Sequence, residues 1–348
     1  MSKLEKVGIG VVGVGIGHAH LSGYAQCPQA EVIAVCDLDE ERAKKVAAEF
    51  GVPNVYTNYD EMLSRSDIDA ISVCTPNFLH APMTIAAFEA GKHVICEKPL
   101  AIDPADGEAM VAAGEKAGKL FMTGFNNRFR GDTQVLKGFI ERGELGEIYY
   151  AKTGWLRRRG IPGMGGWFTT KAKSGGGPLI DLGVHVLDLT LWLMGNPKAV
   201  TVSGTTYAKL GPKGIGASGY GHADGGNTYD VEDLAIGFIR LDTGATVALE
   251  ASWATNIQNE VIYTQLMGEK GGAELDPLRI YTEIAGTQAD IKPYCPEQSG
   301  HIMEIKHFVD CIANGTALIS TGEHGLEITR ILNALYKSAE TGQEIKLR

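Results

Sequence analysis

The sequence predicts an α/β protein of two domains: a doubly wound parallel sheet over residues 1–125, and an α/β domain with a large, mostly antiparallel open sheet over residues 126–348. Two observations lead to this prediction. In the first part, short runs that are apolar on both faces alternate with helix-like stretches, which is typical of a parallel sheet covered by helices. After about Phe125 the predicted strands lengthen and alternate polar with apolar residues, which favours a sheet with one solvated face.

The order of the elements predicts the parallel sheet. Strands are expected at Val7–Val12, Val32–Cys36, Ala70–Cys74, His93–Cys96 and Leu120–Gly124. Helices are expected at about His18–Gln26, Glu40–Phe50, Asp60–Ser64, Pro82–Ala90 and Pro104–Lys116. Such an alternation of strand and helix predicts βαβ units, whose helices cover both faces of the sheet.

The second domain is predicted from longer, half-polar strands. These strands are Ile148–Leu156, Ala199–Lys209, Val231–Leu241, Thr246–Trp253 and Ile262–Met267. The residues Leu241-Asp242-Thr243-Gly244 are typical of a hairpin turn. Covering helices are expected at Pro178–Met194, about Ile302–Ala313, and Gly322–Thr341. The Gly-rich stretch 211–227 is expected to be a surface loop, and either a lid or a subunit contact is compatible with it.

Composition and charge exclude several classes of function. The 348 residues carry a net charge of −10, which disfavours nucleic acid and anionic membranes because both require a basic face. Neither an apolar signal core nor a run of about 18 apolar residues is found. The six cysteines include no C-x-x-C pair, and we interpret them as small core residues in a reducing compartment rather than as disulfides or zinc ligands. We therefore expect a cytoplasmic protein.

The turn after the first strand predicts a dinucleotide site. A G-x-G-x-x-G match within residues 8–13 lies mostly inside the strand, so the useful glycines are Gly13, Gly15 and Gly17. Gly13 allows a sharp turn, Gly15 lets the backbone approach a pyrophosphate, and the following helix offers free N–H groups. His18 stands where the fingerprint has its third glycine, which is a departure from the standard pattern. The expected cofactor contacts at this turn are Gly13, Gly15, Ile16, Gly17 and His18.

Asp37 indicates which dinucleotide is bound. It ends the second strand, 22 residues after Gly15, which is close to the spacing of about 20 expected for a carboxylate that binds ribose. A carboxylate at this point favours NAD and repels the 2′-phosphate of NADP. Arg42 keeps NADP as the alternative, and the alternative for Asp37 is that it only caps the next helix.

Thr75, Pro76 and Asn77 follow the third core strand at its C-terminal end. Open parallel sheets bind their ligands at this edge, so we expect these residues to contact the cofactor. The alternative for Asn77 is a helix cap. His80 lies one turn further along the chain, and it either reaches the cofactor or faces solvent.

Glu97-Lys98-Pro99 follows the buried strand His93–Cys96 directly. Its charges therefore lie at the C-terminal edge of the sheet, and Pro99 restricts Lys98 to extended geometry. A partly desolvated lysine can stabilise a developing alkoxide or relay a proton. The alternative is a solvated ion pair at the end of a strand.

The helix at Pro178–Met194 is almost entirely apolar, and three polar side chains interrupt it. Asp181, His185 and Asp188 are spaced i, i+4 and i+7, so they share one face. Buried charged groups are costly unless they are paired or used, and a histidine is a natural base for a hydroxyl proton. A hydrogen-bonded core network is one alternative. A metal pair is another, although no third ligand has a clear spacing and we expect no metal.

These motifs together resemble the glucose–fructose oxidoreductase/inositol dehydrogenase (Gfo/Idh/MocA) family. The motifs are the Gly-rich turn followed by His20, the strand end at Asp37, Glu97-Lys98-Pro99, Asn127-Arg128-Phe129, and Asp181-x-Gly-x-His185-x-x-Asp188. The segments from Leu156 to Gly163, Trp167-Phe168-Thr169 and 175–181 resemble more narrowly the glucoside 3-dehydrogenase branch.

The resemblance implies a Rossmann domain that binds NAD, followed by an α/β domain whose open sheet often builds the oligomer interface, here of a homodimer or homotetramer. It implies Lys98, Asp181 and His185 as the catalytic set, with Glu97 and Asn126 among the cofactor contacts. The substrate contacts expected besides that set are Arg128, Arg157, Arg158 and Trp167, and the last three have surface positions as their alternative.

We therefore expect an NAD-dependent dehydrogenase that oxidises a ring hydroxyl of a glucoside or related pyranose. His185 would accept the hydroxyl proton, Lys98 would bind the reacting oxygen, and Asp181 would either orient the substrate or tune that pair. The nearest alternatives are an inositol 2-dehydrogenase and a 3-keto-sugar reductase. A non-catalytic NAD-binding regulator is a third alternative, against which the presence of Lys98 and His185 speaks.

Overall fold

The N-terminal sheet of the computed structural model, which describes residues 6–219 and 228–347, has six strands in the order β3-β2-β1-β4-β5-β6, and every neighbouring pair is parallel. The strands are β1 (Val7–Val12), β2 (Ala30–Cys36), β3 (Asn54–Tyr56), β4 (Ala70–Val73), β5 (His93–Glu97) and β6 (Phe121–Gly124). The predicted doubly wound sheet is thus confirmed. The sequence reading missed β3, whose three residues are only half buried and too few to form an apolar run.

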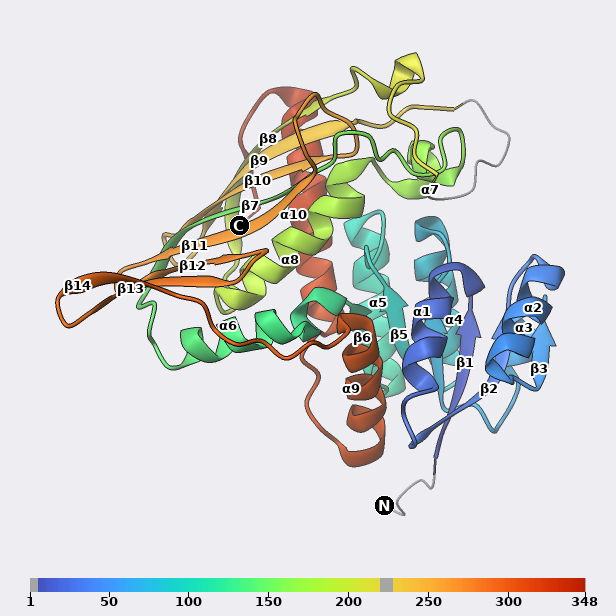
Figure 1. The fold of residues 1–348 in the computed structure, drawn as a ribbon. Coiled ribbons are helices and arrows are strands. Elements are labelled where there is room, and N and C mark those ends of the chain that lie inside the picture. Colours follow the sequence, from blue (N-terminus) through green and yellow to red (C-terminus); the bar gives the residue numbers. More distant parts are fainter. Residues whose placement is uncertain (1–5, 220–227, 348) are drawn as a thin grey trace. The chain divides into compact units, whose positions relative to one another are not determined.

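The helices of this sheet flank it on both sides (Figure 1). They are α1 (Val14–Tyr24), α2 (Glu40–Phe50), α3 (Tyr59–Leu63), α4 (His80–Glu89) and α5 (Pro104–Ala117), with short 3₁₀ turns η1 (Asn77–Leu79) and η2 (Asn126–Phe129). The strand order reverses between β1 and β4. In open α/β sheets a ligand binds at such a point, outside the carboxyl ends of the strands.

The contacts of the chain divide it into two units. The first comprises residues 1–130 and 298–326, and the second comprises residues 131–297 and 327–348. Helix α9 (Gly300–Asn314) thus belongs to the first unit, where Ile305 and Phe308 share a core with Val7 and Ile9 of β1. Helix α10 (Gly322–Thr341) begins in the first unit, and its residues from Glu327 onward belong to the second.

The second unit contains a nine-stranded sheet in the order β14-β13-β12-β11-β7-β10-β9-β8-β15. Its strands are β7 (Ile148–Leu156), β8 (Ala199–Tyr207), β9 (Leu234–Leu241), β10 (Thr246–Ser252), β11 (Val261–Gly268), β12 (Gly272–Leu275), β13 (Arg279–Ile284), β14 (Thr287–Ile291) and β15 (Ile345–Lys346). Strands β7 and β10 pair in parallel, and the other recorded pairs of this sheet are antiparallel. The predicted mostly antiparallel sheet and its hairpin at Leu241–Gly244 are therefore confirmed.

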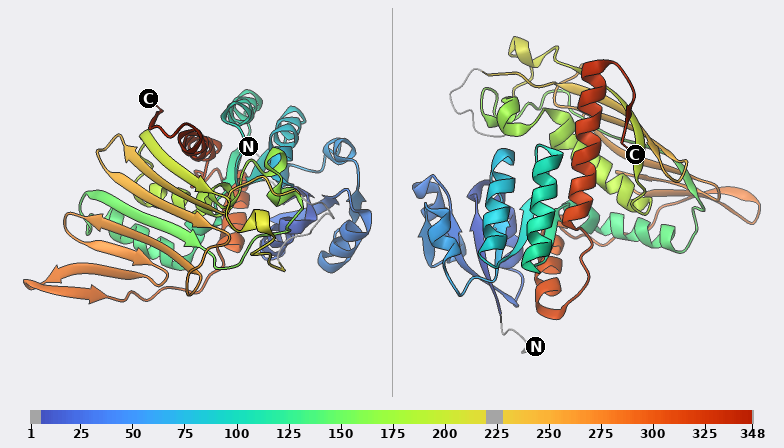
Figure 2. Two further views of the ribbon diagram at one scale, coloured as in Figure 1. Left: turned by 90° about the horizontal axis from the view of Figure 1, so that it is seen from above. Right: turned by 180° about the vertical axis from the view of Figure 1, so that it is seen from behind.

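Helices cover one face of this large sheet. Figure 2 shows α6 (Gly131–Glu141) and α8 (Val184–Leu193) on that face, where α8 packs on β7 and β11. Leu335 of α10 lies against Gly204 and Gly237, on β8 and β9. On β9, Ile236 and Phe238 point the opposite way and are about 40% and 38% exposed. The sheet thus has one covered and one open face.

The predicted helix at Pro178–Met194 is not regular, because a π-helical turn, η4 (Leu179–Gly183), precedes α8. In the Gly-rich stretch predicted as a surface loop, Gly211–Lys213 forms a 3₁₀ turn, η5, and Ala217 bridges to Ile161; residues 220–227 of the stretch lie outside the described residues. Within the described ranges, no helix is long and apolar enough to cross a membrane.

Candidate active site

The turn between β1 and α1 is tighter than the sequence predicted. Gly13 has a φ of 84°, and a Cβ there would lie 2.4 Å from the carbonyl oxygen of Cys74, so only glycine fits. Helix α1 begins at Val14, four residues before the predicted start at His18, because Gly13 alone makes the turn. The glycines that follow it therefore belong to the helix.

Gly15 and Gly17 differ in what surrounds them. A Cβ on Gly15 would meet nothing within 4 Å, which leaves this backbone open to a ligand. A Cβ on Gly17 would lie 3.0 Å from Cγ1 of Val11, so Gly17 lets the helix pack closely on its strand. Close packing of helix on strand is the role of the third glycine in the dinucleotide fingerprint. The chain thus retains that function one position earlier than the standard motif.

The side chains that follow these glycines point outward. Ile16 is 38% exposed. His18 is half exposed and lies 2.9 Å through Nε2 from a carboxylate oxygen of Glu49. The expected contacts of Ile16 and His18 with a cofactor remain predictions.

Asp37 is buried at the end of β2 and connects three segments. Its Oδ2 accepts the N–H of Val14 at 3.0 Å, and its Oδ1 accepts from the N–H of Asp39 and from Arg42. Asp39, not Asp37, caps helix α2, so the alternative that Asp37 only caps that helix is wrong. A carboxylate offers about four lone-pair sites, so these three bonds leave capacity for a ribose hydroxyl.

The segment after β4 is tied to the segment after β5 by His80. This ring is fully buried, and its two nitrogens lie 2.7 Å from the carbonyl oxygen of Pro99 and 2.9 Å from that of Thr75. Burial lowers the pKa of His80. The alternative that His80 faces solvent is wrong. Asn77 is buried in η1 and is not the N-cap of α4, whose cap position is Leu79.

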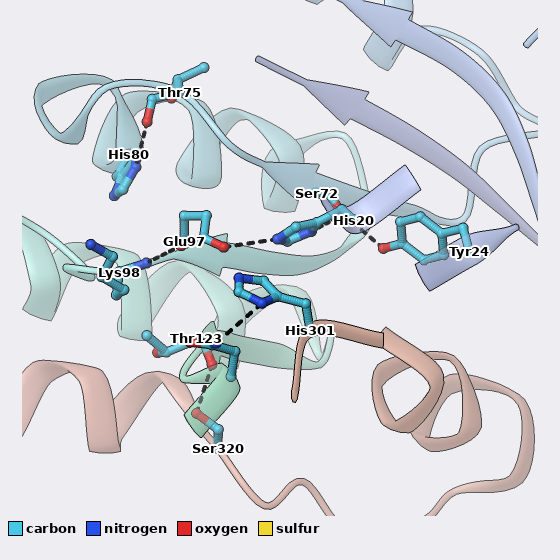
Figure 3. Close-up of polar contacts among 11 residues, drawn as sticks. His20, Tyr24, Ser72, Thr75, His80, Glu97, Lys98, Thr123, His301 and Ser320 are labelled. Atoms are coloured by element: carbon cyan, nitrogen blue, oxygen red, sulfur yellow. Dashed lines mark hydrogen bonds and ion pairs between the residues drawn. The ribbon is translucent and has the colours of Figure 1, made fainter. Parts of the chain in front are cut away.

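Glu97 ends a chain of buried hydrogen bonds within the first unit (Figure 3). The hydroxyls of Tyr24 and Ser72 are 2.7 Å apart, Ser72 Oγ lies 3.1 Å from Nδ1 of His20, and Nε2 of His20 lies 2.9 Å from Oε1 of Glu97. Burial alone would raise the pKa of Glu97, but the hydrogen bond from His20 and nearby positive charge lower it to about 2. Glu97 therefore stays ionised.

Lys98 is the first residue after β5 and is only partly buried. Its backbone N–H donates to Oε2 of Glu97 at 3.2 Å, so the carboxylate fixes the main chain at the point from which the lysine side chain projects. This confirms that the Glu97-Lys98 pair lies at the C-terminal edge of the parallel sheet.

His301 is a titratable group that the sequence reading missed. It lies in the first turn of α9, and Nδ2 of Asn126 lies 3.2 Å from its Nδ1. Its pKa is lowered by burial, while the Glu97 charge opposes that shift. Figure 3 shows its ring near Glu97 and His20. His301 and Glu97 are 204 positions apart in sequence, so no local sequence pattern could indicate that they are neighbours.

Arg128 is 1% exposed and engaged with its own unit. It donates to the carbonyl oxygen of Ile319 at 2.7 Å, contacts Nδ1 of His324, and lies over the ring of Phe125. These contacts give the residue a structural role in joining residues 319–324 to η2. A contact of Arg128 with the substrate remains a prediction.

In the second unit, Asp181 and His185 are partly exposed, whereas Asp188 is 1% exposed. Asp181 lies in the π-helical turn that precedes the regular helix carrying the two others. The predicted shared face of the three side chains remains a prediction. Oδ2 of Asp181 accepts from the indole N–H of Trp253 at 2.9 Å. Trp253 is fully buried, which fixes the position of this oxygen.

A second tryptophan contacts the histidine. The ring of Trp155 lies 5.9 Å from that of His185, centroid to centroid. Its indole N–H donates to Glu260 at 2.9 Å, and the Arg157 guanidinium lies 4.9 Å over the same indole. Arg157 is thus near His185 through Trp155. The sequence did not indicate either tryptophan as a site residue. Trp253 is 72 positions from Asp181, and Trp155 lies within the predicted strand Ile148–Leu156.

Arg158 lies on an irregular segment after β7, and Trp167 begins a short 3₁₀ turn, η3 (Trp167–Thr169). Arg158 is exposed and donates to the carbonyl oxygen of Gln258. Trp167 stacks on Phe168 at 3.8 Å, and Phe168 meets Trp253 edge to face. An aromatic series therefore extends from Trp167 to the tryptophan that binds Asp181. Whether Arg157, Arg158 and Trp167 touch a substrate remains a prediction.

Glu232 holds the start of the π-helical turn. Its carboxylate is buried and accepts the N–H groups of Gly177 and Leu179 at 2.9 and 3.0 Å, and the hydroxyl of Tyr336 at 2.8 Å. Burial raises the pKa of Glu232. A buried carboxylate at this point stabilises the wide turn that carries Asp181.

All six cysteines are free, and five of them are buried. Within residues 6–219 and 228–347, no group of three or more His, Cys, Asp or Glu side chains could hold a metal ion.

Comparison with known proteins gives the family. A model described as an oxidoreductase family with an NAD-binding Rossmann fold matches residues 7–125, and the GFO/IDH/MocA C-terminal domain matches residues 133–274. The chain belongs to the Gfo/Idh/MocA family. It is an oxidoreductase, and its first sheet is an NAD-binding Rossmann fold.

Relatives within the Gfo/Idh/MocA family span nearly the whole chain. D-glucoside 3-dehydrogenase of Escherichia coli K12 is 36% identical, with 97% of each chain covered. Myo-inositol 2-dehydrogenase of Thermotoga maritima is 27% identical, with 97% of this chain and 98% of the relative covered. A solved structure of levoglucosan dehydrogenase in complex with NADH has a TM-score of 0.88 at 25% identity and covers 99% of each chain.

Proposed function

We propose that this Gfo/Idh/MocA oxidoreductase is an NAD-dependent dehydrogenase that oxidises a ring hydroxyl, the one at C3, of a glucoside or related pyranose to the keto sugar. The observation that supports the reaction type is the pair Asp181 and His185, partly exposed on an otherwise buried helical segment and each held by a tryptophan. The substrate class is supported by the 36% identity to D-glucoside 3-dehydrogenase over nearly the full chain.

In this proposal Lys98, Asp181 and His185 form the catalytic set that acts on the sugar. His185 accepts the hydroxyl proton, since an imidazole is well matched to proton transfer near neutral pH. Lys98 hydrogen-bonds the reacting oxygen and stabilises its developing charge. Asp181, oriented by Trp253, accepts a hydrogen bond from a neighbouring hydroxyl and sets the sugar's orientation.

The cofactor proposal rests on residues that fit NAD. Gly15 leaves an open backbone at the helix start, where N–H groups are available to phosphate, and Asp37 has acceptor capacity for a ribose hydroxyl. When bound, NAD⁺ supplies the hydride acceptor. Asp37 favours NAD over NADP by charge repulsion of a 2′-phosphate, although Arg42 beside it offers a positive charge.

Two further properties belong to the proposal. The free, mostly buried cysteines are consistent with a reducing, cytoplasmic compartment. The open face of the large sheet, with Ile236 and Phe238 exposed, supports a homodimer or homotetramer.

A substrate panel tests the function. We expect NADH to form with methyl glucosides and not with the matched 3-deoxy glucosides, and product NMR to place the carbonyl at C3. NADH formation confined to myo- or scyllo-inositol would instead identify an inositol 2-dehydrogenase, for which the Thermotoga relative is the precedent. Reduction of 3-keto sugars with NADH at a much higher rate than glucoside oxidation would instead identify the protein as a 3-keto-sugar reductase.

Variants test the residue roles. Lys98→Ala and His185→Ala should each lower kcat by about 10²–10⁴-fold while NADH binding stays intact, because each removes a group that acts on the reacting hydroxyl. Near-normal turnover in either variant would contradict the scheme.

A further inference from the structure

Glu97 is a buried carboxylate to which the proposed chemistry assigns no role. Carboxylates accept hydrogen bonds and cannot donate them when ionised, so His20 must donate to Glu97 through Nε2–H. On the other side of the ring, Nδ1 meets the Ser72 hydroxyl, which can donate or accept. The donor on Nε2 of His20 therefore points toward Glu97.

The two oxygens of Glu97 have different partners. Oε1 is bound by His20, a fully buried side chain of α1, and Oε2 accepts the backbone N–H of Lys98. The carboxylate thus links α1 to the main chain of Lys98. A shift of the carboxylate would displace this main chain, and misplacement of a catalytic group by 1 Å can cost on the order of 100-fold in rate.

We propose that His20 is a positioning residue of the dehydrogenase reaction, which acts by holding the Glu97 carboxylate against the main chain of Lys98. The inference rests on the proposed role of Lys98 in the reaction. His20 touches neither substrate nor cofactor in this proposal, and its whole effect passes through Glu97.

The surroundings of Glu97 show why His20 matters more than its other neighbours. Without a hydrogen-bond donor, desolvation would drive the buried Glu97 toward its neutral form, because burial is the largest influence on its pKa and acts to raise it. Glu97 also interacts electrostatically with five other titratable groups. These are Lys98, His301, His80, Cys74 and Cys96. The thiols are neutral near pH 7, since burial raises their pKa, and burial lowers the pKa of both histidines.

The test compares His20→Leu with His20→Gln. Leucine removes the donor, so Glu97 should titrate between about pH 4 and pH 9, whereas the carboxylate of the wild-type protein does not. We expect kcat of His20→Leu to fall on the order of 100-fold. Its pH profile should gain an acid limb where Glu97 titrates, in addition to the limb that the proposed base His185 gives the wild type. Glutamine offers an amide N–H to the same oxygen and should restore part of the rate and the wild-type shape of the pH profile.

The titration of Glu97 is read directly, from the ¹³C carboxyl signal of protein labelled at glutamate and assigned with Glu97→Gln. The matched control is Tyr24→Phe, which removes a hydroxyl from the same buried series two links away and should leave both pH profiles unchanged. NADH binding measured by fluorescence shows that each variant is folded.

Two outcomes overturn the proposal: a Glu97 signal that does not titrate in His20→Leu, or a pH profile of kcat in that variant with the wild-type shape. Failure of the proposed function is a different result. If the wild-type protein oxidises no sugar or polyol, the carboxyl signals still report whether His20 controls Glu97, because they require no substrate.

Discussion

Gly13, Gly15 and Gly17 stand two residues apart and are expected to respond differently to the same substitution. Gly13 has a positive φ and carbonyl atoms of Cys74 against it, Gly17 has Val11 against it, and Gly15 has open space. The sequence alone could not rank them, because the spacing of the three glycines departs from the standard fingerprint. The ranking follows from what a Cβ would meet at each position.

We predict that Gly15→Ala leaves the thermal unfolding midpoint within about 2 °C of the wild type and weakens NAD binding, because the added methyl stands where the phosphates approach. Gly17→Ala should instead lower the midpoint by several degrees, since Val11 must move. Calorimetry and NADH fluorescence measure the two effects. Equal destabilisation by both variants would show that the helix start is arranged differently.

Asp37 carries the proposed preference for NAD. Asp37→Ser should remove the charge that repels a 2′-phosphate and leave Arg42 beside it, so kcat/KM with NADP relative to NAD should rise about 10-fold or more. The control is Asp39→Ser, a nearby change that retains a helix cap and should leave the ratio unchanged. An unchanged cofactor ratio in Asp37→Ser would argue against contact of Asp37 with the ribose.

Among the elements, the π-helical turn η4 depends on a partner far away in sequence. Gly177 and Leu179 donate to Glu232, which lies 55 and 53 positions further along the chain. A periodic apolar pattern therefore predicted one regular helix where the structure has a wide turn and then α8. Helix α2, in contrast, was predicted with its actual ends because Asp39 caps it locally and its apolar face is regular.

Glu232→Gln is expected to lower kcat more than it raises KM, because it weakens the support under Asp181 while NAD binding is unaffected. It should also change the pH dependence of stability. The pKa of Glu232 is raised in the folded state, so that state binds the extra proton, and the free energy of unfolding should decrease as pH rises from the ordinary Glu value toward the raised one. Denaturant unfolding at several pH values should show this slope only in the wild type.

Tyr336→Phe is the control for that variant, since it removes one bond to Glu232 and leaves the backbone N–H groups of the turn on the carboxylate. We expect its kcat to stay close to that of the wild type. A loss of kcat in Tyr336→Phe as large as in Glu232→Gln would assign the effect to general packing around the carboxylate.

For the whole molecule, the sequence predicted both sheets but not their extent. Strands β12 to β15 were missed because each has at most two buried side chains, and β14 and β15 have none to mark them. The assignment of residues 298–326 to the first unit was also missed, since the helical pattern of α9 does not indicate which core it joins. His301 was missed for the same reason, because it lies on α9 within that segment.

The open sheet face gives a prediction on assembly. Phe238→Lys places a charge among exposed apolar side chains of β9 and should shift the proposed homo-oligomer toward monomer in sedimentation velocity. Phe78→Lys, at a 42% exposed position of the first unit, is the matched control and should not change the sedimentation coefficient. Identical behaviour of the two variants would place the interface elsewhere.

The return of residues 298–326 to the first unit also has a consequence for biosynthesis. The core around β1 needs Phe308 and Val309, and the ribosome adds these residues only after it has made nearly all of the second unit. At a translation rate of about 5–20 residues per second, roughly 10 to 40 s pass between the synthesis of Arg130 and that of the 298–326 segment. During this interval the N-terminal βαβ units cannot complete their core, and the apolar surface that α9 later covers stays exposed.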